Sequence, residues 1–287
     1  MKALSILIPT YNDECYTLVS SLQEQAASLG ISYEIIVADD GSSDMTVVSR
    51  NRAINKLPQC RVIERQQNSG RAAIRNFLMQ QAQYEWVLFI DSDMVVCRKD
   101  FIKQYAAIDD AKVAYGGVVI GKVTRANLRS IYEQSKEQEH TLSKRQQSPY
   151  SDFHTANFLI RLDIILNHPF DERFRYYGYE DVLLGKLLKE HKITIKHIDN
   201  PLSFEVFETN DAFISKTEEG LRTLHRFRDE LNGYSRLLDF VSQHRTLATM
   251  VKHWHRIAAK WERRQLAGNT PSLTLFNLYR LGYYLQL

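Results

Sequence analysis

Two carboxylates follow a short apolar segment at residues 86–90. Asp91 and Asp93 are separated by Ser92, and in an extended chain residues i and i+2 project to the same side. Neighbouring carboxylates repel each other, and a hard divalent cation relieves that repulsion. Mg²⁺ or Mn²⁺ typically binds one or two protein carboxylates and completes its coordination with phosphate and water. The pair therefore indicates a metal site, and a pair of solvated turn aspartates is the alternative.

A second acidic cluster follows the apolar segment 34–38. Asp39 and Asp40 precede Gly41, which suits a tight turn, and Asp44 can cap a following helix. Two adjacent aspartates exceed what a turn needs. One of them is therefore available to accept a hydrogen bond from the N–H of a nucleobase.

Two further clusters stand at predicted helix starts. Residues 68–76 include Arg71 and Arg75, and exposed helix N–H groups with nearby arginines suit phosphate or nucleobase recognition. Glu180 and Asp181 precede an apolar segment. They are explained either as acids at a helix N-terminus or as carboxylates presented for general-base chemistry.

The elements that would position these clusters alternate between strand and helix. Apolar runs predict strands at 3–8, 34–38, 61–64, 86–90, 157–160 and 193–198, and spacing predicts helices at about 13–29, 44–56, 70–83 and 179–190. Such alternation predicts a mostly parallel sheet, whose ligands collect beyond the carboxyl ends of the strands. Residues 121–152 are weakly patterned and predict an irregular helix or a mobile surface segment.

The order and spacing of these clusters resemble glycosyltransferase family 2, the inverting enzymes with the GT-A fold. The matching motifs are Ser5 to Asn12 with Glu14, Asp39-Asp40-Gly41-Ser42 with Asp44, Asn68-x-Gly70 with Ala73-x-Arg75-Asn76, Asp91-x-Asp93 and Glu180-Asp181. The resemblance covers about residues 3–210. It implies an α/β, GT-A catalytic domain at 1–210, with a Rossmann-like mixed sheet flanked by helices. A C-terminal helical extension would follow at 211–287.

The resemblance also implies roles for individual positions. Asp93, with Asp91, would bind Mn²⁺ or Mg²⁺. Asp181 would be the catalytic base. The acceptor would contact Glu180, Tyr177, Gly178 and Asn157, and the nucleotide-sugar would contact Pro9, Thr10, Tyr11, Glu14, Asp40, Asn68, Gly70, Arg75, Asp91 and Ser92. Many family members carry a histidine metal ligand where this chain has Phe204, which leaves the third protein ligand open.

The implied reaction is metal-dependent, inverting transfer from a UDP-sugar to a hydroxyl of a saccharide acceptor, in bacterial cell-surface polysaccharide or glycoconjugate synthesis. One alternative is a sugar nucleotidyltransferase, which needs a Gly-rich phosphate loop that residues 9–13 do not provide. A Rossmann dehydrogenase fails for the same reason. A non-catalytic nucleotide-sugar-binding subunit is the other alternative, and the presence of Asp91, Asp93 and Asp181 speaks against it.

Composition limits partners and location. The chain has 287 residues, a net charge of +3 and three separated cysteines. These values argue against a nucleic-acid partner and against a disulfide framework. The apolar runs are far shorter than the ~20 residues of a spanning helix. We therefore expect a cytoplasmic protein, at most peripheral on the inner face of a membrane.

The C-terminal region leaves several interpretations open. Leu247, Val251, Trp254, Ala258 and Trp261 form one apolar stripe at helical spacing, with Arg245, Lys252, Arg256, Lys260, Arg263 and Arg264 around it against the single acid Glu262. This helix either packs on the catalytic domain or rests on an anionic membrane surface. The tail at 273–287 would pack, form a homo-oligomer or lie in an interface.

Overall fold

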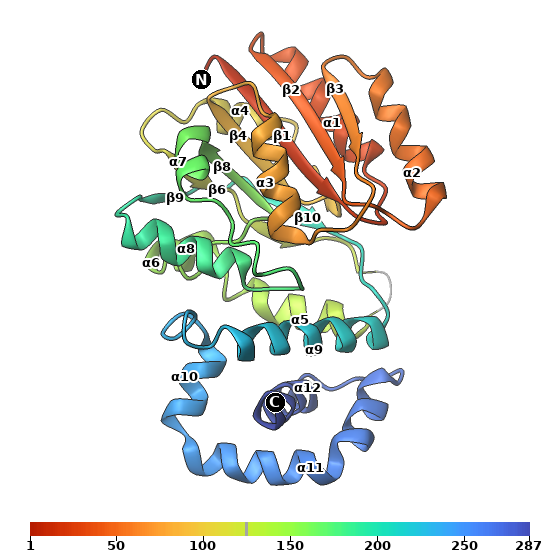
Figure 1. Cartoon of the computed structure of the whole chain (residues 1–287), viewed down its shortest axis with the longest axis vertical. Coiled ribbons are helices and arrows are strands. Elements are labelled where there is room, and N and C mark those ends of the chain that lie inside the picture. The colour runs from red at the N-terminus through yellow and green to blue at the C-terminus, as the bar shows by residue number, and fades with distance from the viewer. Residues whose placement is uncertain (124–125) are drawn as a thin grey trace.

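The computed structural model describes residues 1–123 and 126–287 (Figure 1). Thr124 and Arg125, which belong to the weakly patterned segment 121–152, lie outside the described residues. A seven-stranded sheet runs in the order β3-β2-β1-β4-β8-β6-β9. Its strands are β1 (Ala3–Thr10), β2 (Ser32–Asp39), β3 (Cys60–Glu64), β4 (Trp86–Ile90), β6 (Val113–Tyr115), β8 (Asn157–Arg161) and β9 (Ile195–His197).

The sheet is mixed. β1, β2, β3 and β4 run parallel, whereas β8 is antiparallel to both β4 and β6. A second sheet has the order β5-β10-β7, with β5 (Met94–Val95), β7 (Val118–Ile120) and β10 (Leu202–Phe204). β5 begins directly after Asp93, so the small sheet lies at the carboxyl end of β4.

Alternation along the strands divides the core into two layers. In β1, Leu4, Ile6 and Ile8 belong to one buried cluster and Leu7 belongs to the other, as the two-residue period of a strand requires. The first cluster contains buried side chains of α1 (Tyr16–Ser28) and α4 (Phe101–Ala106). The second contains those of α3 (Arg71–Gln81), α7 (Leu162–Asn167) and α8 (Glu180–Glu190). Helices therefore cover both faces of the sheet.

Asp44 starts the next helix as the sequence predicts. Its side chain accepts hydrogen bonds from the backbone N–H groups of Thr46 and Val47, and α2 (Met45–Asn51) follows. A 3₁₀ turn, η1 (Arg52–Lys56), completes the helical segment predicted at 44–56. Within the weakly patterned segment, the structure has two helices, α5 (Leu128–Glu137) and α6 (Leu142–Gln147).

The remaining chain is helical. It comprises α9 (Asn210–Arg226), α10 (Arg236–Gln243), α11 (Arg245–Ala267) and α12 (Leu273–Gln286). In Figure 1, α9 lies beneath α5 and α8, and α10, α11 and α12 lie beyond it, farthest from the sheet. Phe276, Tyr279 and Tyr284 of α12 are buried. The tail predicted to pack, associate or lie in an interface is therefore packed within the chain.

The apolar stripe predicted on α11 is divided in the structure. Val251 and Ala258 are buried, whereas Leu247, Trp254 and Trp261 are about half exposed. Arg263, predicted on the free basic face, is paired with Asp211 of α9 at 2.7 Å. No helix among the described residues has both the length and the apolarity needed to cross a bilayer.

Candidate active site

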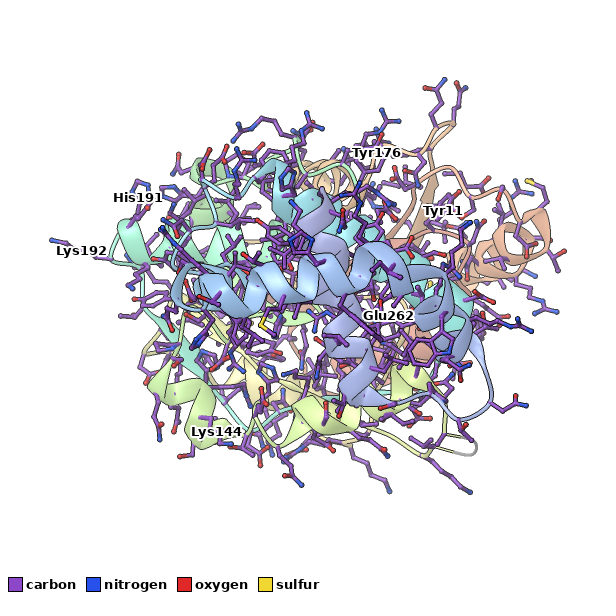
Figure 2. All side chains as sticks on the ribbon, turned by 90° about the horizontal axis from the view of Figure 1, so that it is seen from below. Tyr11, Lys144, Tyr176, His191, Lys192 and Glu262 are labelled. Atoms are coloured by element: carbon purple, nitrogen blue, oxygen red, sulfur yellow. The ribbon has the colours of Figure 1, made fainter. Side chains whose placement is uncertain are left out.

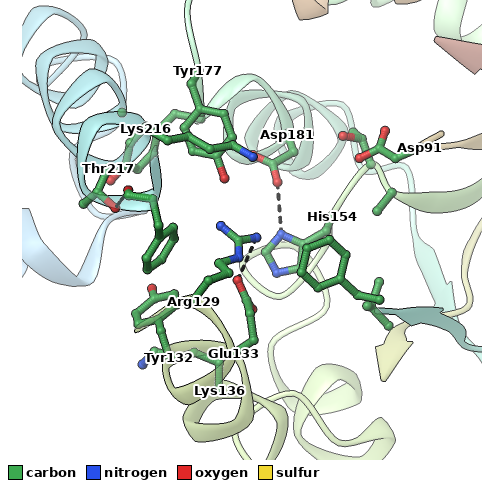
Figure 3. A pocket seen from close by; sticks show the side chains of 18 of the residues that line it. Asp91, Arg129, Tyr132, Glu133, Lys136, His154, Tyr177, Asp181, Lys216 and Thr217 are labelled. Carbon is green, nitrogen blue, oxygen red and sulfur yellow. Dashed lines mark hydrogen bonds and ion pairs between the residues drawn. The ribbon is translucent and has the colours of Figure 1, made fainter. Parts of the chain in front are cut away.

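A cavity of about 420 Å³ opens between the carboxyl ends of the strands and the helices α5, α8, α9 and α12 (Figure 3). Six carboxylates line it: Asp91 and Asp93 after β4, Glu133 and Glu137 on α5, and Glu180 and Asp181 on α8. Two segments 88 residues apart therefore meet at one cavity, because the end of β4 and the start of α8 both face it. Tyr177 and Gly178, predicted on the acceptor side, also line the cavity.

Asp91 and Asp93 stand where β4 ends, as the sequence predicts. Burial, followed by the negative charge of Asp91, raises the pKa of Asp93 to about 6. A bound divalent cation would relieve this cost, so the donor pair fits a metal that takes its other ligands from phosphate and water. No group of three or more His, Cys, Asp or Glu side chains suited to a metal occurs in the part of the chain that the structure describes.

The strand beside this pair supplies an apolar side chain. In β10, Phe204 is paired with Met94, the residue after Asp93. Phe204 is buried and lines the cavity, and the guanidinium of Arg129 lies over its ring, 5.2 Å from the centroid. A third metal ligand therefore does not come from position 204.

Arg75 joins the two halves of the site. Its side chain is 2% exposed, and its two terminal nitrogens lie 2.5 Å from Asp91 Oδ1 and 3.3 Å from Glu180 Oε1. Gly70 precedes the helix that carries Arg75 and has a φ of +94°, and a Cβ there would lie 2.3 Å from the carbonyl oxygen of Arg175. The sequence placed Arg75 among the nucleotide contacts, whereas the structure places it behind the carboxylates, where it sets their positions.

The two adjacent acids of α8 have different surroundings. Burial, followed by the charge of Asp181, raises the pKa of Glu180, although Arg75 and Arg71 oppose the shift. Burial would also raise the pKa of Asp181, but the hydrogen bond and charge of His154 outweigh it and lower that pKa. Asp181 is thus the carboxylate held ionised at neutral pH, which is the state a general base requires.

His154 is a site residue that sequence reasoning missed. Its Nδ1 lies 3.0 Å from Asp181 Oδ2 (Figure 3). Burial lowers the pKa of His154, but the hydrogen bond and charge of Asp181 raise it above the ordinary value. The two residues are 27 positions apart on different elements, so no spacing in the sequence indicates the pair.

The residues predicted to hold the nucleotide lie along the ends of β1 and β2. Thr10 pairs with Asp39 in register, and Tyr11 is 48% exposed at the turn that follows. Asn68 is exposed and Ser92 half-buried. Pro9 is half-buried near the end of β1. None of these five lines the large cavity. Ser92 lies in the turn between Asp91 and Asp93, which do line the cavity, and this turn follows β4, the strand that pairs with β1.

Asp40 is already engaged within the chain. Its carboxylate accepts hydrogen bonds from the backbone N–H groups of Ser69 and Gly70, from the Ser69 hydroxyl and from Arg65. These contacts shape the loop that leads into α3. In contrast, Oδ2 of Asp39 is buried and has no hydrogen-bond partner among the described residues.

Two further residues that were predicted to contact a ligand have their side chains engaged within the chain. Asn157 is fully buried, and its amide bonds to the Tyr105 hydroxyl and to the carbonyl oxygens of Gly117 and Asn200. This corrects the expectation that Asn157 approaches the acceptor, because its polar atoms are consumed in joining strand ends. Glu14 forms an exposed ion pair with Arg50 at 2.9 Å.

The side of the cavity away from β4 carries cations on aromatic rings. Arg71 and Lys216 lie 4.9 and 4.8 Å from the centroid of Tyr177. Arg280 and Lys136 lie 5.3 and 5.9 Å from that of Tyr132. Lys216 comes from α9 and Arg280 from α12, so the C-terminal helices complete the cavity wall. Apart from Arg71 and Tyr177, sequence reasoning missed these residues, since their helices gave no motif.

A mixed sheet flanked by helices, with paired carboxylates where a central strand ends and a second acidic pair at the start of α8, is typical of glycosyltransferases with the GT-A fold. The model of the family described as Glycosyl transferase family 2 matches residues 5–167. The chain belongs to glycosyltransferase family 2.

Curated relatives agree with this assignment. The poly(ribitol-phosphate) beta-glucosyltransferase of Bacillus spizizenii is 32% identical over 212 residues, which cover 72% of this chain and 29% of that protein. The poly(ribitol-phosphate) beta-N-acetylglucosaminyltransferase TarS of Staphylococcus aureus is 34% identical over 134 residues, 46% of this chain and 22% of that protein. The matched regions therefore span less than a third of these relatives' lengths.

Solved structures agree on the fold. Residues 1–349 of S. aureus TarS superpose with a TM-score of 0.52 at 19% identity, covering 99% of this chain and 89% of that one. The mannosyltransferase PcManGT of Pyrobaculum calidifontis, solved with GDP-Man and Mn²⁺, has a TM-score of 0.55 at 12% identity, covering 99% and 84%. The fold is GT-A with added C-terminal helices, as the resemblance implied.

Proposed function

We propose that the chain transfers a sugar from a UDP-sugar to an acceptor hydroxyl, with inversion and with the help of a divalent cation. The observation that carries this proposal is the meeting of three features at one cavity. These are the Asp91–Asp93 pair and Asp181 with its His154 partner, which line the cavity, and the buried Arg75, which joins Asp91 to Glu180. Family membership and a TarS structure solved with UDP support the nucleotide class.

The donor would occupy the edge formed by the ends of β1, β2 and β4. Pro9, Thr10 and Tyr11 would contact the nucleoside, together with Asn68 and Ser92. Asp39 or Asp40 would accept the base N–H. The buried oxygen of Asp39 lacks a partner, whereas a base would have to join or replace a hydrogen bond at Asp40. Gly70 and Arg75 would act indirectly, by fixing the loop and the carboxylates.

Asp93, with Asp91, would hold Mn²⁺ or Mg²⁺ against the donor diphosphate. The cation supplies Lewis-acid stabilisation of the charge that develops on the leaving diphosphate. The buried position of Asp93 beside Asp91 favours such a cation over two bare carboxylates.

Asp181 would remove the proton of the acceptor hydroxyl. A bond forms between that oxygen and the sugar C1, the C1–O bond to the diphosphate breaks, and the electron pair leaves with UDP. Attack from the face opposite the leaving group inverts the anomeric centre. His154 would keep Asp181 oriented and ionised through the 3.0 Å contact. Glu180, held by Arg75, would bind the acceptor beside the base.

The acceptor would lie against Tyr177, Gly178 and the cationic wall of α5, α9 and α12. Arg280 lines this wall and forms no ion pair with the described residues. Its free donors suit an acceptor that bears an anionic group. Poly(ribitol-phosphate) in the names of two relatives belongs to that chemical class, and it supports a role in cell-surface glycopolymer synthesis.

The test is UDP release from a panel of UDP-sugars, with and without Mn²⁺ and with candidate saccharide and polyol-phosphate acceptors. We expect metal-dependent release that an acceptor stimulates, and its loss in Asp181→Asn. Release of pyrophosphate from a nucleoside triphosphate and a sugar phosphate would instead identify a nucleotidyltransferase. Tight UDP-sugar binding without any turnover would identify a non-catalytic subunit.

A further inference from the structure

The helix α11 exposes a continuous apolar stripe. Of twelve large hydrophobic side chains that are exposed among the described residues, five lie on this one helix. They are Leu247, Met250, Trp254, Ile257 and Trp261, with exposed fractions of 47%, 65%, 49%, 88% and 52%. Their spacing of three and four residues places them on one side of the helix. The stripe extends over about 21 Å at 1.5 Å per residue.

This stripe is distinct from the side of α11 that packs within the chain. The buried residues are Ala248, Val251, His255, Ala258, Glu262 and Leu266. They form a second row, which faces α12 and α9. Figure 2, seen from below, shows α11 across the face of the molecule that lies opposite the sheet. The apolar stripe is therefore available to a partner outside the chain.

The rest of the exposed surface of α11 is basic. Arg245, Lys252, Arg256, Lys260 and Arg264 are all exposed. At about 100° per residue, Lys260 and Arg264 adjoin the apolar stripe, Arg256 lies midway round the helix, and Arg245 and Lys252 lie nearer the buried row. None of them forms an ion pair with the residues that the structure describes. Their positive charges are therefore available to a negatively charged partner outside the chain.

The single acid of α11 does not lie on that surface. Glu262 is fully buried, where it accepts hydrogen bonds from Trp254 Nε1 at 2.7 Å and contacts His255 Nδ1 at 2.6 Å. The hydrogen bond also fixes one edge of the Trp254 indole while its ring stays half exposed. The outward face of α11 thus combines apolar side chains, two tryptophans and basic charge, without an exposed carboxylate.

We propose that this face of α11 docks on an anionic lipid surface. Exposed apolar residues would enter the headgroup boundary, where tryptophan is favoured. The neighbouring lysines and arginines would meet lipid phosphates, at about 1 kcal/mol each. A second copy of the chain fits less well, because pairing identical stripes brings two basic faces together without an acid to neutralise them. The proposal stands independently of the proposed transfer reaction.

The experiment is co-sedimentation with vesicles of neutral phosphatidylcholine or of phosphatidylcholine mixed with phosphatidylglycerol. We expect binding to the anionic vesicles that weakens as salt rises from low to high concentration, because surface charges are screened. Trp emission should shift to shorter wavelength when Trp254 and Trp261 leave water. Binding to neither vesicle at low salt overturns the proposal.

Two double variants separate the apolar and the electrostatic contributions. Met250→Ser with Ile257→Ser removes exposed apolar groups, and Lys260→Gln with Arg264→Gln removes the two charges beside the stripe. Each is expected to weaken vesicle partition roughly 10- to 30-fold. All four side chains are exposed, so thermal unfolding should remain within a few degrees of the parent and exclude misfolding as the cause.

Matched control variants change exposed residues far from α11 in the sequence. Met45 is 60% exposed on α2, and Lys56 and Lys103 are exposed lysines outside the C-terminal helices. Met45→Ser, and Lys56→Gln with Lys103→Gln, should leave vesicle binding unchanged, and an equal loss in these controls contradicts the assignment to α11. Sedimentation velocity tests whether a second copy of the chain covers the stripe instead. A dimer that disappears in the Met250/Ile257 variant would assign the stripe to a second copy and overturn the lipid proposal.

Discussion

His154 Nδ1 lies 3.0 Å from Asp181 Oδ2, at the cavity that Asp91 and Asp93 also line (Figure 3). Each residue shifts the other's proton affinity. The contact raises the pKa of His154 above 6.5 and lowers that of Asp181 below 3.8, in both cases against burial. His140 and Tyr115 pack against the imidazole. The pKa of His140 falls to about 4 through burial and then through the charge of His154, so His140 is neutral.

Replacing His154 should move the pH dependence of sugar transfer. In His154→Gln, only the Val182 N–H and the charge of Arg75 still oppose the effect of burial on Asp181, so the pKa of Asp181 rises. The acidic limb of kcat/KM should therefore shift to higher pH, whereas donor binding should not change. Measuring kcat/KM from pH 4 upward checks this. A variant with lower activity but an unmoved acidic limb would show that His154 serves packing only.

The contact between His154 and Asp181 also predicts how the free energy of unfolding depends on pH. A His pKa raised in the folded state contributes stability below its unfolded value of about 6.5, and this is lost as pH rises through the folded pKa. The lowered Asp181 pKa contributes stability above about 3.8, which is lost at more acid pH. His154→Gln should thus lose more unfolding free energy at pH 5.5 than at pH 9, as urea unfolding would measure.

Arg75 should dominate the stability of the site. Its removal as Arg75→Met leaves Glu180 buried beside Asp181 with only Arg71, at 3.9 Å, as a cation partner, and breaking a buried pair typically costs about 3–5 kcal/mol. Arg50→Met is the matched control, because the Arg50–Glu14 pair is exposed and such pairs contribute about 0–1 kcal/mol. Urea unfolding compares the two. Equal losses would contradict the role given to Arg75, and Glu180→Gln added to Arg75→Met should restore part of the loss.

Asp93 should control metal-dependent nucleotide binding. In Asp93→Asn the metal loses a charged ligand, so UDP affinity in the presence of Mn²⁺ should fall, whereas the weak affinity measured in a chelator should stay the same. Calorimetry with UDP under both conditions tests this. Asp110→Asn, at an exposed ion pair with Lys196, is the control. Unchanged Mn²⁺-dependent affinity in Asp93→Asn would remove Asp93 from the metal site.

The sequence predicts the first half of the fold well because its signals are local. The run Trp86–Ile90 is bounded by polar residues on both sides, and the strand has those bounds. The carboxylate pair that follows lies in a turn rather than in extended chain, yet both side chains line the cavity because they come directly after the strand. Asp44 as a helix cap is equally local, since it bonds to N–H groups two and three residues ahead.

The sequence does not predict a residue's role where that role depends on a contact between distant elements. Asn157 and Arg75 have polar side chains at strand and helix positions that suggest ligand contacts, yet burial turns both inward. His154 and Arg280 become site residues only because α8 and α12 approach the same cavity. On α11, residues at the same helical spacing divide into a buried and an exposed row, which depends on where α12 packs.

The two acids of α8 should have different kinetic roles. Asp181→Asn keeps the shape of the side chain but loses its basicity, so turnover should fall roughly 10²–10⁴-fold with little effect on donor affinity. Glu180→Gln should instead weaken acceptor binding and raise KM. Transfer rates at saturating acceptor decide between them. If Glu180→Gln is inactive and Asp181→Asn retains turnover, the two roles are reversed.

Arg280 should determine how well an anionic acceptor binds. The guanidinium lies over the rings of Tyr132 and Phe276, so its position is fixed by packing while its donors remain free for a ligand. A hydrogen bond to a charged group contributes about 1.5–3 kcal/mol. Arg280→Gln should therefore raise the KM for a polyol-phosphate acceptor roughly 10- to 100-fold and leave kcat and UDP affinity nearly unchanged.

A neutral acceptor and a remote arginine complete this test. The KM for the corresponding neutral polyol or saccharide should change far less in Arg280→Gln, because no anionic group is present to lose its partner. Arg228→Gln, at an exposed position outside the cavity, should behave like the parent with both acceptors. Equal increases in KM for the charged and the neutral acceptor would show that Arg280 supports the cavity wall by packing, and that the acceptor's anionic group is bound elsewhere.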